Sequence, residues 1–244
     1  MFYGFDPVYL IIIGVCTVLS LVASGYVKLK FSRGQQVTIR SGRSGAEIAR
    51  MILRDQDIAD VEVVEHQGFL SDHYHPTKKT LNLSPDVYHG TNAAAAGVAA
   101  HEVGHAIQHA QGDITMWGRS VLVYPANFGS MLGPVLVMIG LMLAAGHAVV
   151  AGTAAYYVAV SGVMLFGIAT LCSIVIVFNE FNASSRARVA LLRLGVIDHG
   201  QEEDTVRGVL NAAGLTYLAA AVAALAQLLY WAWRAGLIGG GRRN

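Results

Sequence analysis

Four apolar stretches that contain no Asp, Glu, Lys or Arg constrain this chain more than any other feature of its sequence. They cover residues 7–27, 131–150, 154–178 and 215–233. Each is close to or above the roughly 20 residues that a helix needs to cross the hydrocarbon core of a bilayer. The chain is 54% hydrophobic and only 14% charged, which is far more apolar than a soluble domain. The sequence therefore predicts a membrane protein with four spans, and a net charge of +1 gives no reason to expect a nucleic-acid partner.

Basic side chains gather after the first and the third of these stretches. The two clusters are Lys28, Lys30, Arg33, Arg40 and Arg43, and Arg186, Arg188, Arg193 and Arg207. Because positively charged loops stay in the cytoplasm, we expect both clusters on the cytoplasmic side and the N-terminus outside. Three arginines beyond the fourth stretch are an exception to this pattern. The first stretch has no basic residue before it and no small-residue cleavage site, so we interpret it as a retained anchor.

The polar part of the chain contains a second informative pattern, His101-Glu102-Val103-Gly104-His105. Residues four apart lie on one face of a helix, so the two histidines can offer two imidazole nitrogens to one ion, with Glu102 beside it. This HExxH spacing is typical of zinc metalloproteases, in which the glutamate acts as the general base. We predict a helix over residues 91–110, capped by Thr91 or Asn92 and stopped at Gly112. The alternative is a buried helix with two hydrogen-bonded histidines.

A catalytic zinc usually has three protein ligands, so this motif needs one more. His109 lies two helical turns beyond His101, roughly 12 Å along the axis, which is too far to join the same ion. Glu180 is the candidate that we favour, because two spans separate it from His105 and return it to the same side of the membrane. The competing interpretation makes Glu180 a charge at a helix N-terminus. Four weaker alternatives lie in what we expect to be a solvated loop: Asp198, His199, Glu202 and Glu203.

The segment between the anchor and the metal helix is predicted to form one helix and two strands, over residues 45–53, 61–64 and 80–83. The loop 71–76 between the strands carries His73 and His75, which either touch the site or, as we favour, are surface or supporting groups. In several metalloprotease folds an exposed strand above the metal helix receives the substrate in extended form, and residues 80–83 are the candidate. The donor that stabilises an oxyanion stays open among His73, Tyr74, Arg186 and Tyr217.

Several stretches together resemble the YugP-type family of membrane zinc metallopeptidases. They are Gly68 with His73 and Tyr74, Leu83 to Pro85, residues 99–109, Glu180 and Phe181 with Ala183 and Ser184, and Leu210 to Ala212 with Thr216 and Tyr217. The resemblance implies a gluzincin-like membrane endopeptidase, distantly similar to HtpX-type and prenyl-protein proteases. It implies one Zn²⁺ per chain, held by His101, His105 and Glu180, with Glu102 as the base.

The chain departs from the family pattern at one position. Two places after the ligand glutamate, where the family usually has Asp, this chain has Asn182. If that position supports a ligand histidine, the amide keeps a hydrogen bond but loses the negative charge that raises ligand basicity. We then expect lower zinc affinity or activity. Asn182, His73, Tyr74 and Tyr217 are our candidates for groups that support the ligands or touch substrate.

These observations predict a mainly α fold, a multi-span helical membrane protein with a small α+β zincin-like catalytic portion. Its expected parts are an anchor (1–27), the catalytic portion (28–128), a transmembrane hairpin (129–178), a third-ligand helix with a cytoplasmic loop (179–212) and a fourth span with a tail (213–244). We expect a zinc endopeptidase of the bacterial cell membrane that faces the cytoplasm and cleaves membrane or membrane-proximal proteins. Its partners are then peptide substrate and lipid, while membrane partner proteins and homo-oligomers stay open.

Two other classes of function remain as alternatives. One is a catalytically silent membrane scaffold or partner-binding subunit that retains a zinc site, and the intact Glu102 counts against it. The other is a metal transporter, which would carry ionisable groups within its spans. The four stretches lack such groups, so we favour the enzyme.

Overall fold

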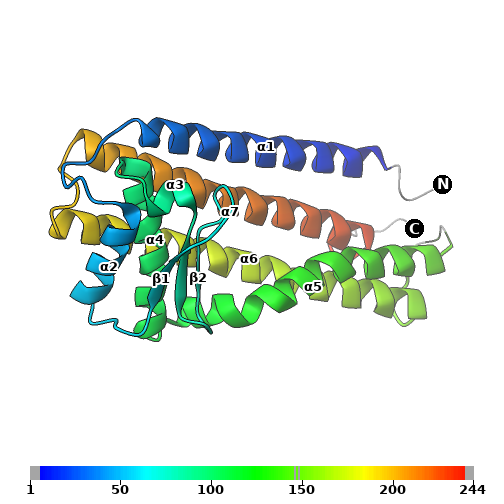
Figure 1. Cartoon of the computed structure of the whole chain (residues 1–244). Coiled ribbons are helices and arrows are strands. Elements are labelled where there is room, and N and C mark those ends of the chain that lie inside the picture. The colour runs from blue at the N-terminus through cyan, green and yellow to red at the C-terminus, as the bar shows by residue number, and fades with distance from the viewer. Residues whose placement is uncertain (1–5, 146, 148, 240–244) are drawn as a thin grey trace. The chain divides into compact units, whose positions relative to one another are not determined.

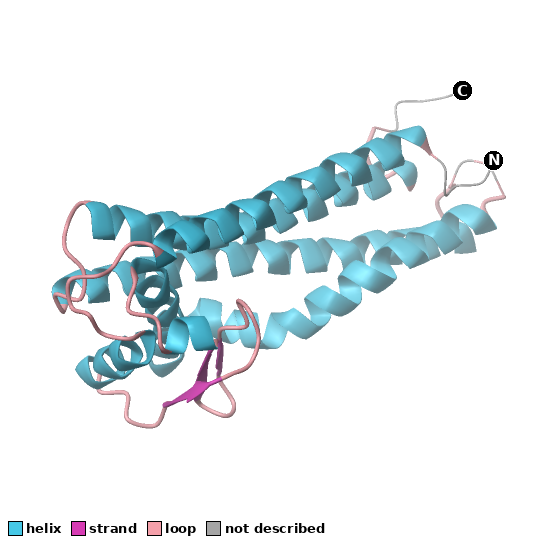
Figure 2. Ribbon diagram, turned by 45° about the horizontal axis from the view of Figure 1, so that its top comes forward, coloured by secondary structure: helices cyan, strands magenta, loops and turns pink. Residues whose placement is uncertain are grey.

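The computed structural model describes residues 6–145, 147 and 149–239, and most of these are helical (Figures 1 and 2). The elements are α1 (Pro7–Gln35), α2 (Gly45–Asp55), β1 (Glu62–Glu65), β2 (His73–His75), β3 (Thr80–Leu83), α3 (Pro85–Tyr88), α4 (Ala93–Ala110), α5 (Ile114–Leu143), α6 (Ala154–Arg193) and α7 (Gln201–Arg234). Within the described residues, four helices have the length and composition to cross a membrane: Pro7–Gln35, Ala126–Leu143, Ala154–Arg193 and Gln201–Arg234. The predicted fold class, a mainly α membrane protein with a small sheet, is confirmed.

The long helices extend well past the apolar runs that the sequence marks. Helix α6 continues from its span through the polar string that contains Glu180 and ends before Gly195, whose φ of 62° favours glycine. Glu180 therefore lies inside a continuous helix, and the alternative that made it an N-terminal charge is wrong. Glu202 and Glu203 lie in the first turn of α7 and not in a loop, so they take the role of N-terminal helix charges.

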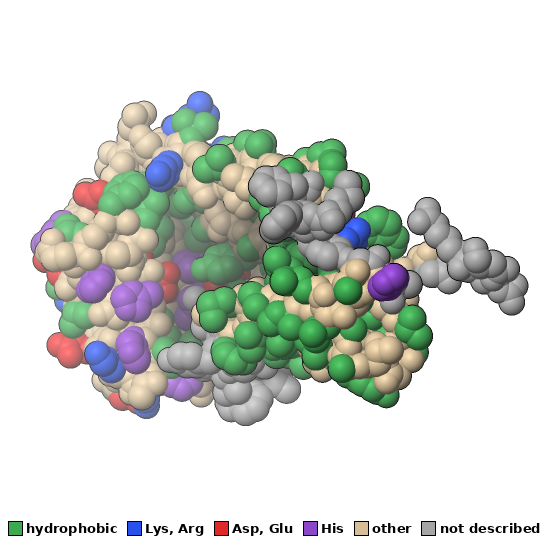
Figure 3. Space-filling view, turned by 90° about the vertical axis from the view of Figure 1, so that its right-hand side faces the viewer, with side chains coloured by type: hydrophobic (Ala, Val, Ile, Leu, Met, Phe, Trp, Pro, Cys, Tyr) green, Lys and Arg blue, Asp and Glu red, His purple; other side chains and the backbone are tan. Residues whose placement is uncertain are grey.

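Chain contacts divide the protein into two compact units, and unit 1 consists of Met1–Leu21, Val121–Ile176 and Leu218–Asn244. Small residues let the backbones of α5 and α6 touch within it. A methyl group added at Gly140 would lie 2.6 Å from the backbone nitrogen of Ala159. This close approach of small residues is typical of helix pairs in lipid, where packing replaces the hydrophobic effect. Apolar side chains cover much of the spanning-helix surface visible in Figure 3.

Unit 2 consists of Val22–Ser120 and Val177–Tyr217, and α4 lies at its centre. Helices α2 and α3 and the sheet all pack against α4. The sequence supports this arrangement locally, because Ser44 and Glu47 form a reciprocal capping box that starts α2. The core of the unit includes Ile48, Leu81, Val103 and Leu191, each fully buried.

The sheet of unit 2 has the strand order β1-β3-β2, with β1 parallel and β2 antiparallel to β3. The expected strands 61–64 and 80–83 are present as β1 and β3, but part of the predicted loop 71–76 forms β2. Because β3 is the central strand, both of its edges are already hydrogen-bonded. The prediction that residues 80–83 receive substrate by strand addition is therefore wrong, and β2 is the edge strand that contacts α4.

Candidate metal centre

The metal helix forms where the sequence predicts it. Asn92 caps α4 by accepting a hydrogen bond from the backbone of Ala95 at 3.0 Å, and Gly112, with a φ of 62°, follows its end. The alanine-rich first half of α4 is almost entirely buried, because its small side chains let neighbouring helices come close. The predicted helix, its cap and its stop are confirmed.

Gly104 brings α6 onto α4 at the level of the motif. A methyl group added at Gly104 would lie 2.6 Å from the backbone oxygen of Ala183, closer than a Cβ atom approaches an oxygen in real structures. Only glycine therefore permits this contact between the two backbones. Glu180 lies one turn before Ala183 on α6, so the contact places its carboxylate over the two histidines of α4.

His101, His105 and Glu180 form a compact cluster of ligand atoms. One carboxylate oxygen of Glu180 lies 3.1 Å from Nε2 of His101, and the other lies 3.6 Å from Nε2 of His105. One ligand atom from each residue can be chosen so that all three lie within 4.8 Å of one another. Their side chains are 12%, 3% and 2% exposed for His101, His105 and Glu180. Two imidazoles and a carboxylate form the His₂Glu donor set of catalytic zinc sites, so these residues fit the ion that the motif implies.

A buried amide fixes which nitrogen of His105 faces the cluster. The backbone carbonyl of Asn179 can only accept, so the Gln108 amide nitrogen, 3.1 Å away, must donate to it. The oxygen of Gln108 then faces Nδ1 of His105 at 2.9 Å, so Nδ1 carries the proton. In the neutral imidazole, Nε2 is then the nitrogen with the lone pair, and it is Nε2 that faces Glu180. Hydrogen bonds of this kind orient ligand histidines and raise their basicity.

His101 has a comparable support from α6. Its Nδ1 lies 3.1 Å from the hydroxyl of Ser184, one turn after Glu180 on the same helix. The sequence reasoning missed both Ser184 and Gln108 as supports. Their spacing is the signal that could have found them: Gln108 is three residues after His105, and Ser184 is four after Glu180.

Asn182 supports the centre through Gln108, the side chain that contacts the ligand histidine His105. Its side-chain oxygen accepts hydrogen bonds from Gln108 at 2.9 Å and from Arg186 Nε at 2.6 Å. Arg186 also binds Gln111 and Asp113. In the structure Gln108 links Asn182 to the ligand histidine His105, and the positive charge beside Asn182 belongs to Arg186.

Glu102 lies beside the cluster in a fixed orientation. It is 8% exposed, and one of its oxygens accepts a hydrogen bond from the backbone of Tyr74 in β2 at 2.9 Å. The edge strand thus holds one carboxylate oxygen of Glu102. Asp72, which sequence reasoning did not single out, is held by the backbone and hydroxyl of Ser84. Burial raises the pKa of Asp72 and Glu102 adds to this rise, although the Ser84 bonds oppose it.

A cavity of about 320 Å³ in unit 2 opens onto these groups. His101, Glu102, Glu180, Asp72 and Tyr217 line it, together with apolar residues of α1 and α7. The carboxylate of Glu102 lies next to three side chains that could bind one metal ion. This arrangement suits the addition of water to a polarised carbonyl.

The other proposed contact residues of loop 71–76 are turned to other partners. His73 donates from Nδ1 to the backbone of Ser71 at 2.8 Å, and the hydroxyl of Tyr74 pairs with Nδ1 of His109, also at 2.8 Å. Burial, followed by the nearby Asp60 carboxylate, raises the pKa of Tyr74 to about 12. Among the described residues, the cavity wall includes Tyr217 but neither of these two side chains.

The weaker ligand candidates near the start of α7 are used in ion pairs. Glu203 binds Arg188 at 3.1 Å and His199 at 2.8 Å. Asp198 pairs with Arg40 at 2.8 Å, and Glu202 accepts from the backbone of Arg40 at 2.9 Å. Of the carboxylates considered from the sequence, Glu180 is the one that the structure brings to the histidines.

Comparison with known proteins gives two matches. A family model described as "Putative neutral zinc metallopeptidase" matches residues 9–236. The chain is 39% identical over 211 residues to "Putative membrane protease YugP" of Bacillus subtilis (strain 168). This alignment covers 86% of this chain and 89% of that protein. No solved structure matches the chain significantly.

Proposed function

This chain belongs to the family of neutral zinc metallopeptidases, and on that premise we propose that it is an integral membrane zinc endopeptidase of the gluzincin type. It hydrolyses peptide bonds of membrane or membrane-proximal proteins. The observation that carries the proposal is the donor cluster of His101, His105 and Glu180, of which His101 and Glu180 line one cavity together with the oriented Glu102.

Each residue of the centre has a defined task in this reaction. The two histidines and Glu180 would hold a Zn²⁺ ion, which would supply polarisation of the scissile carbonyl and a lowered pKa of bound water. Glu102 takes a proton from the attacking water and passes it to the leaving amine. The Tyr74 amide keeps Glu102 in place, and Gln108 holds His105 in the tautomer that can bind metal.

The walls of the cavity support a membrane-proximal substrate. Val27 and Phe31 of α1 and Leu210 and Ala213 of α7 line it, together with Lys28, Asp72 and the charged groups of the centre on α4 and α6. Val27 is the last residue of the apolar run in α1, so this wall continues directly into a spanning segment. An extended polypeptide that leaves the bilayer with apolar side chains matches such a cavity better than a charged soluble peptide does.

We further propose that the centre faces the cytoplasm of a bacterial cell. Support comes from the basic residues that follow the first and third spans, because positive charge is retained on that side. Both clusters belong to unit 2, which also contains the donor cluster.

The decisive experiment compares Glu102→Gln with His101→Ala in purified protein and in membranes. Glu102→Gln keeps an oxygen that accepts from Tyr74 and leaves the donor cluster intact, so zinc content should stay at the wild-type level. Turnover should fall by at least the roughly hundredfold expected for a lost general base. His101→Ala should lose the metal as well.

New protein N-termini in membranes from wild-type and Glu102→Gln cells identify the substrates. The scaffold alternative makes the opposite prediction, since a partner-binding subunit needs no general base. If Glu102→Gln complements a deletion fully and the pattern of N-termini does not change, the enzyme proposal fails.

A further inference from the structure

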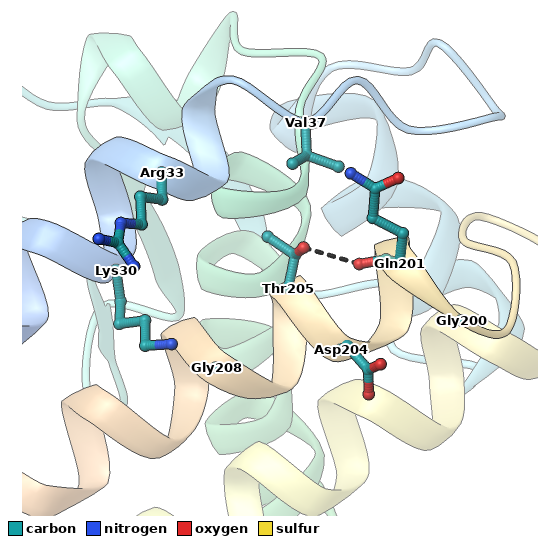
Figure 4. A pocket seen from close by; sticks show the side chains of 8 residues that line it. All are labelled: Lys30, Arg33, Val37, Gly200, Gln201, Asp204, Thr205 and Gly208. Carbon is teal, nitrogen blue, oxygen red and sulfur yellow. Dashed lines mark hydrogen bonds between the residues drawn. The ribbon is translucent and has the colours of Figure 1, made fainter.

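A second cavity in unit 2 lies between the end of α1 and the start of α7 (Figure 4). Its volume is about 530 Å³, which is within the range of small-molecule sites. Lys30 and Arg33 reach it from α1, and Thr205 and Gly208 line it from α7. Among the described residues, the metal centre contributes nothing to its wall, so this space needs its own explanation.

The charge of this cavity is positive and uncompensated. Lys30 and Arg33 form no ion pair with any described residue. Lys30 is half-buried, and its ammonium lies 5.4 Å from the ring centroid of Tyr26. Asp204, the acidic residue in the wall, is already paired with Arg207 at 2.6 Å. The two cations therefore remain available to a negatively charged ligand.

The position of the two cations along α1 matches the polar surface of a bilayer. With a rise of 1.5 Å per residue, Lys30 lies roughly 5 Å and Arg33 roughly 9 Å beyond Val27, where the apolar run ends. The headgroup layer of one leaflet is roughly 5 to 8 Å thick, so along α1 Lys30 begins within this layer and Arg33 just beyond its outer border. Basic pockets between transmembrane helices at this depth suit the phosphate of an acidic lipid.

Gly208 keeps the cavity open beside Lys30. A methyl group added there would lie 3.6 Å from the Lys30 ammonium, which is an ordinary contact. Alanine therefore fits without displacing anything, whereas a leucine would extend further into the space that the ligand needs. A substitution at Gly208 can thus reduce ligand binding in the cavity without changing the charge of its wall.

We propose that this cavity binds a phosphate group, with Lys30 and Arg33 as its cationic contacts. The position of the cavity along α1 favours the headgroup of an acidic phospholipid as the origin of this phosphate group. Free phosphate offers the same chemical group. The site is separate from the donor cluster, so the proposal stands independently of the peptidase function.

The test uses the full chain purified in detergent and titrated with phosphatidylglycerol or phosphatidylcholine under native mass spectrometry. Wild type should prefer the acidic lipid by at least tenfold. The double variant Lys30→Gln/Arg33→Gln should lose this preference, because each basic residue near an acidic surface contributes enough for two to give roughly thirtyfold. Gly208→Leu should weaken binding although both charges remain, and Gly208→Ala should bind as wild type does.

A matched control removes two charges elsewhere in unit 2. Arg43 and Arg54 are exposed and lie outside the cavity wall, so Arg43→Gln/Arg54→Gln should retain the preference. Inorganic phosphate in a thermal-shift assay separates the sources: a shift in wild type that Lys30→Gln/Arg33→Gln abolishes, without lipid preference, assigns the site to free phosphate. The proposal is overturned if wild type responds to neither probe, if the control loses the preference equally, or if Gly208→Leu binds normally.

Discussion

Gly104→Ala tests whether the contact between α4 and α6 builds the metal centre. The added methyl group would lie 2.6 Å from the Ala183 oxygen and 3.2 Å from two further backbone atoms of that residue. Carbon atoms pack best at about 3.5 to 4.0 Å, so the helices must separate by roughly 0.5 Å or more. Metal–ligand distances in zinc sites lie within about 0.2 Å of their usual values, so a shift of this size disturbs the ligand geometry. We expect zinc affinity to fall roughly tenfold or more.

Stability is a second readout with opposing contributions. Alanine in place of glycine favours a helix by about 1 kcal/mol, whereas overpacking in a core costs about 1 to 3 kcal/mol. We therefore expect Gly104→Ala to be neutral or destabilised by up to about 2 kcal/mol. Both quantities are measurable in the purified protein, by a competitive zinc chelator assay and by thermal unfolding of the metal-free form.

Gly97→Ala is the matched control on the same buried helix. A methyl group at Gly97 would lie 3.4 Å from a side-chain carbon of Val206, which is an ordinary contact. This variant should keep wild-type zinc affinity and gain up to about 1 kcal/mol of stability. If Gly104→Ala binds zinc as tightly as wild type and gains as much stability as Gly97→Ala, the argument from the helix contact is refuted.

Three further predictions concern the ligands and the orientation of the centre. Glu180→Gln should strongly reduce the zinc content of purified protein, because a neutral amide is a poorer ligand, while Glu203→Gln should leave it unchanged; the reverse result would show that the wrong carboxylate was chosen. Gln108→Leu should lower zinc affinity roughly 10- to 100-fold by releasing the ligand histidine, and an unchanged chelator titration would contradict the tautomer argument. Cysteines placed at the exposed positions Arg43 and Ser185 should resist a membrane-impermeant reagent in intact cells, and labelling of either one would place the centre outside.

The local and periodic features of this protein can be read from the sequence. Uncharged runs of span length predict the membrane helices, and histidines four apart with an Asn92 cap predict α4 and its shared face. The position of Glu180 follows from counting two membrane crossings, without any knowledge of packing. The helices and the cap form as predicted because each depends on neighbouring residues, whereas the crossing count relies on a fixed barrier, the bilayer, and its membrane side stays a prediction.

The tertiary structure alone decides how the centre is held together and where substrate can lie. Strand β2 forms from residues with no clear strand pattern because pairing with β3 supplies its hydrogen bonds, and it occupies the edge that the sequence had assigned to β3. The Gln108 bond to the Asn179 carbonyl and the contact of Gly104 with Ala183 join segments more than seventy residues apart. Such contacts depend on how closely two backbones approach, which is set by the packing of all their neighbours and leaves no periodic trace in the sequence.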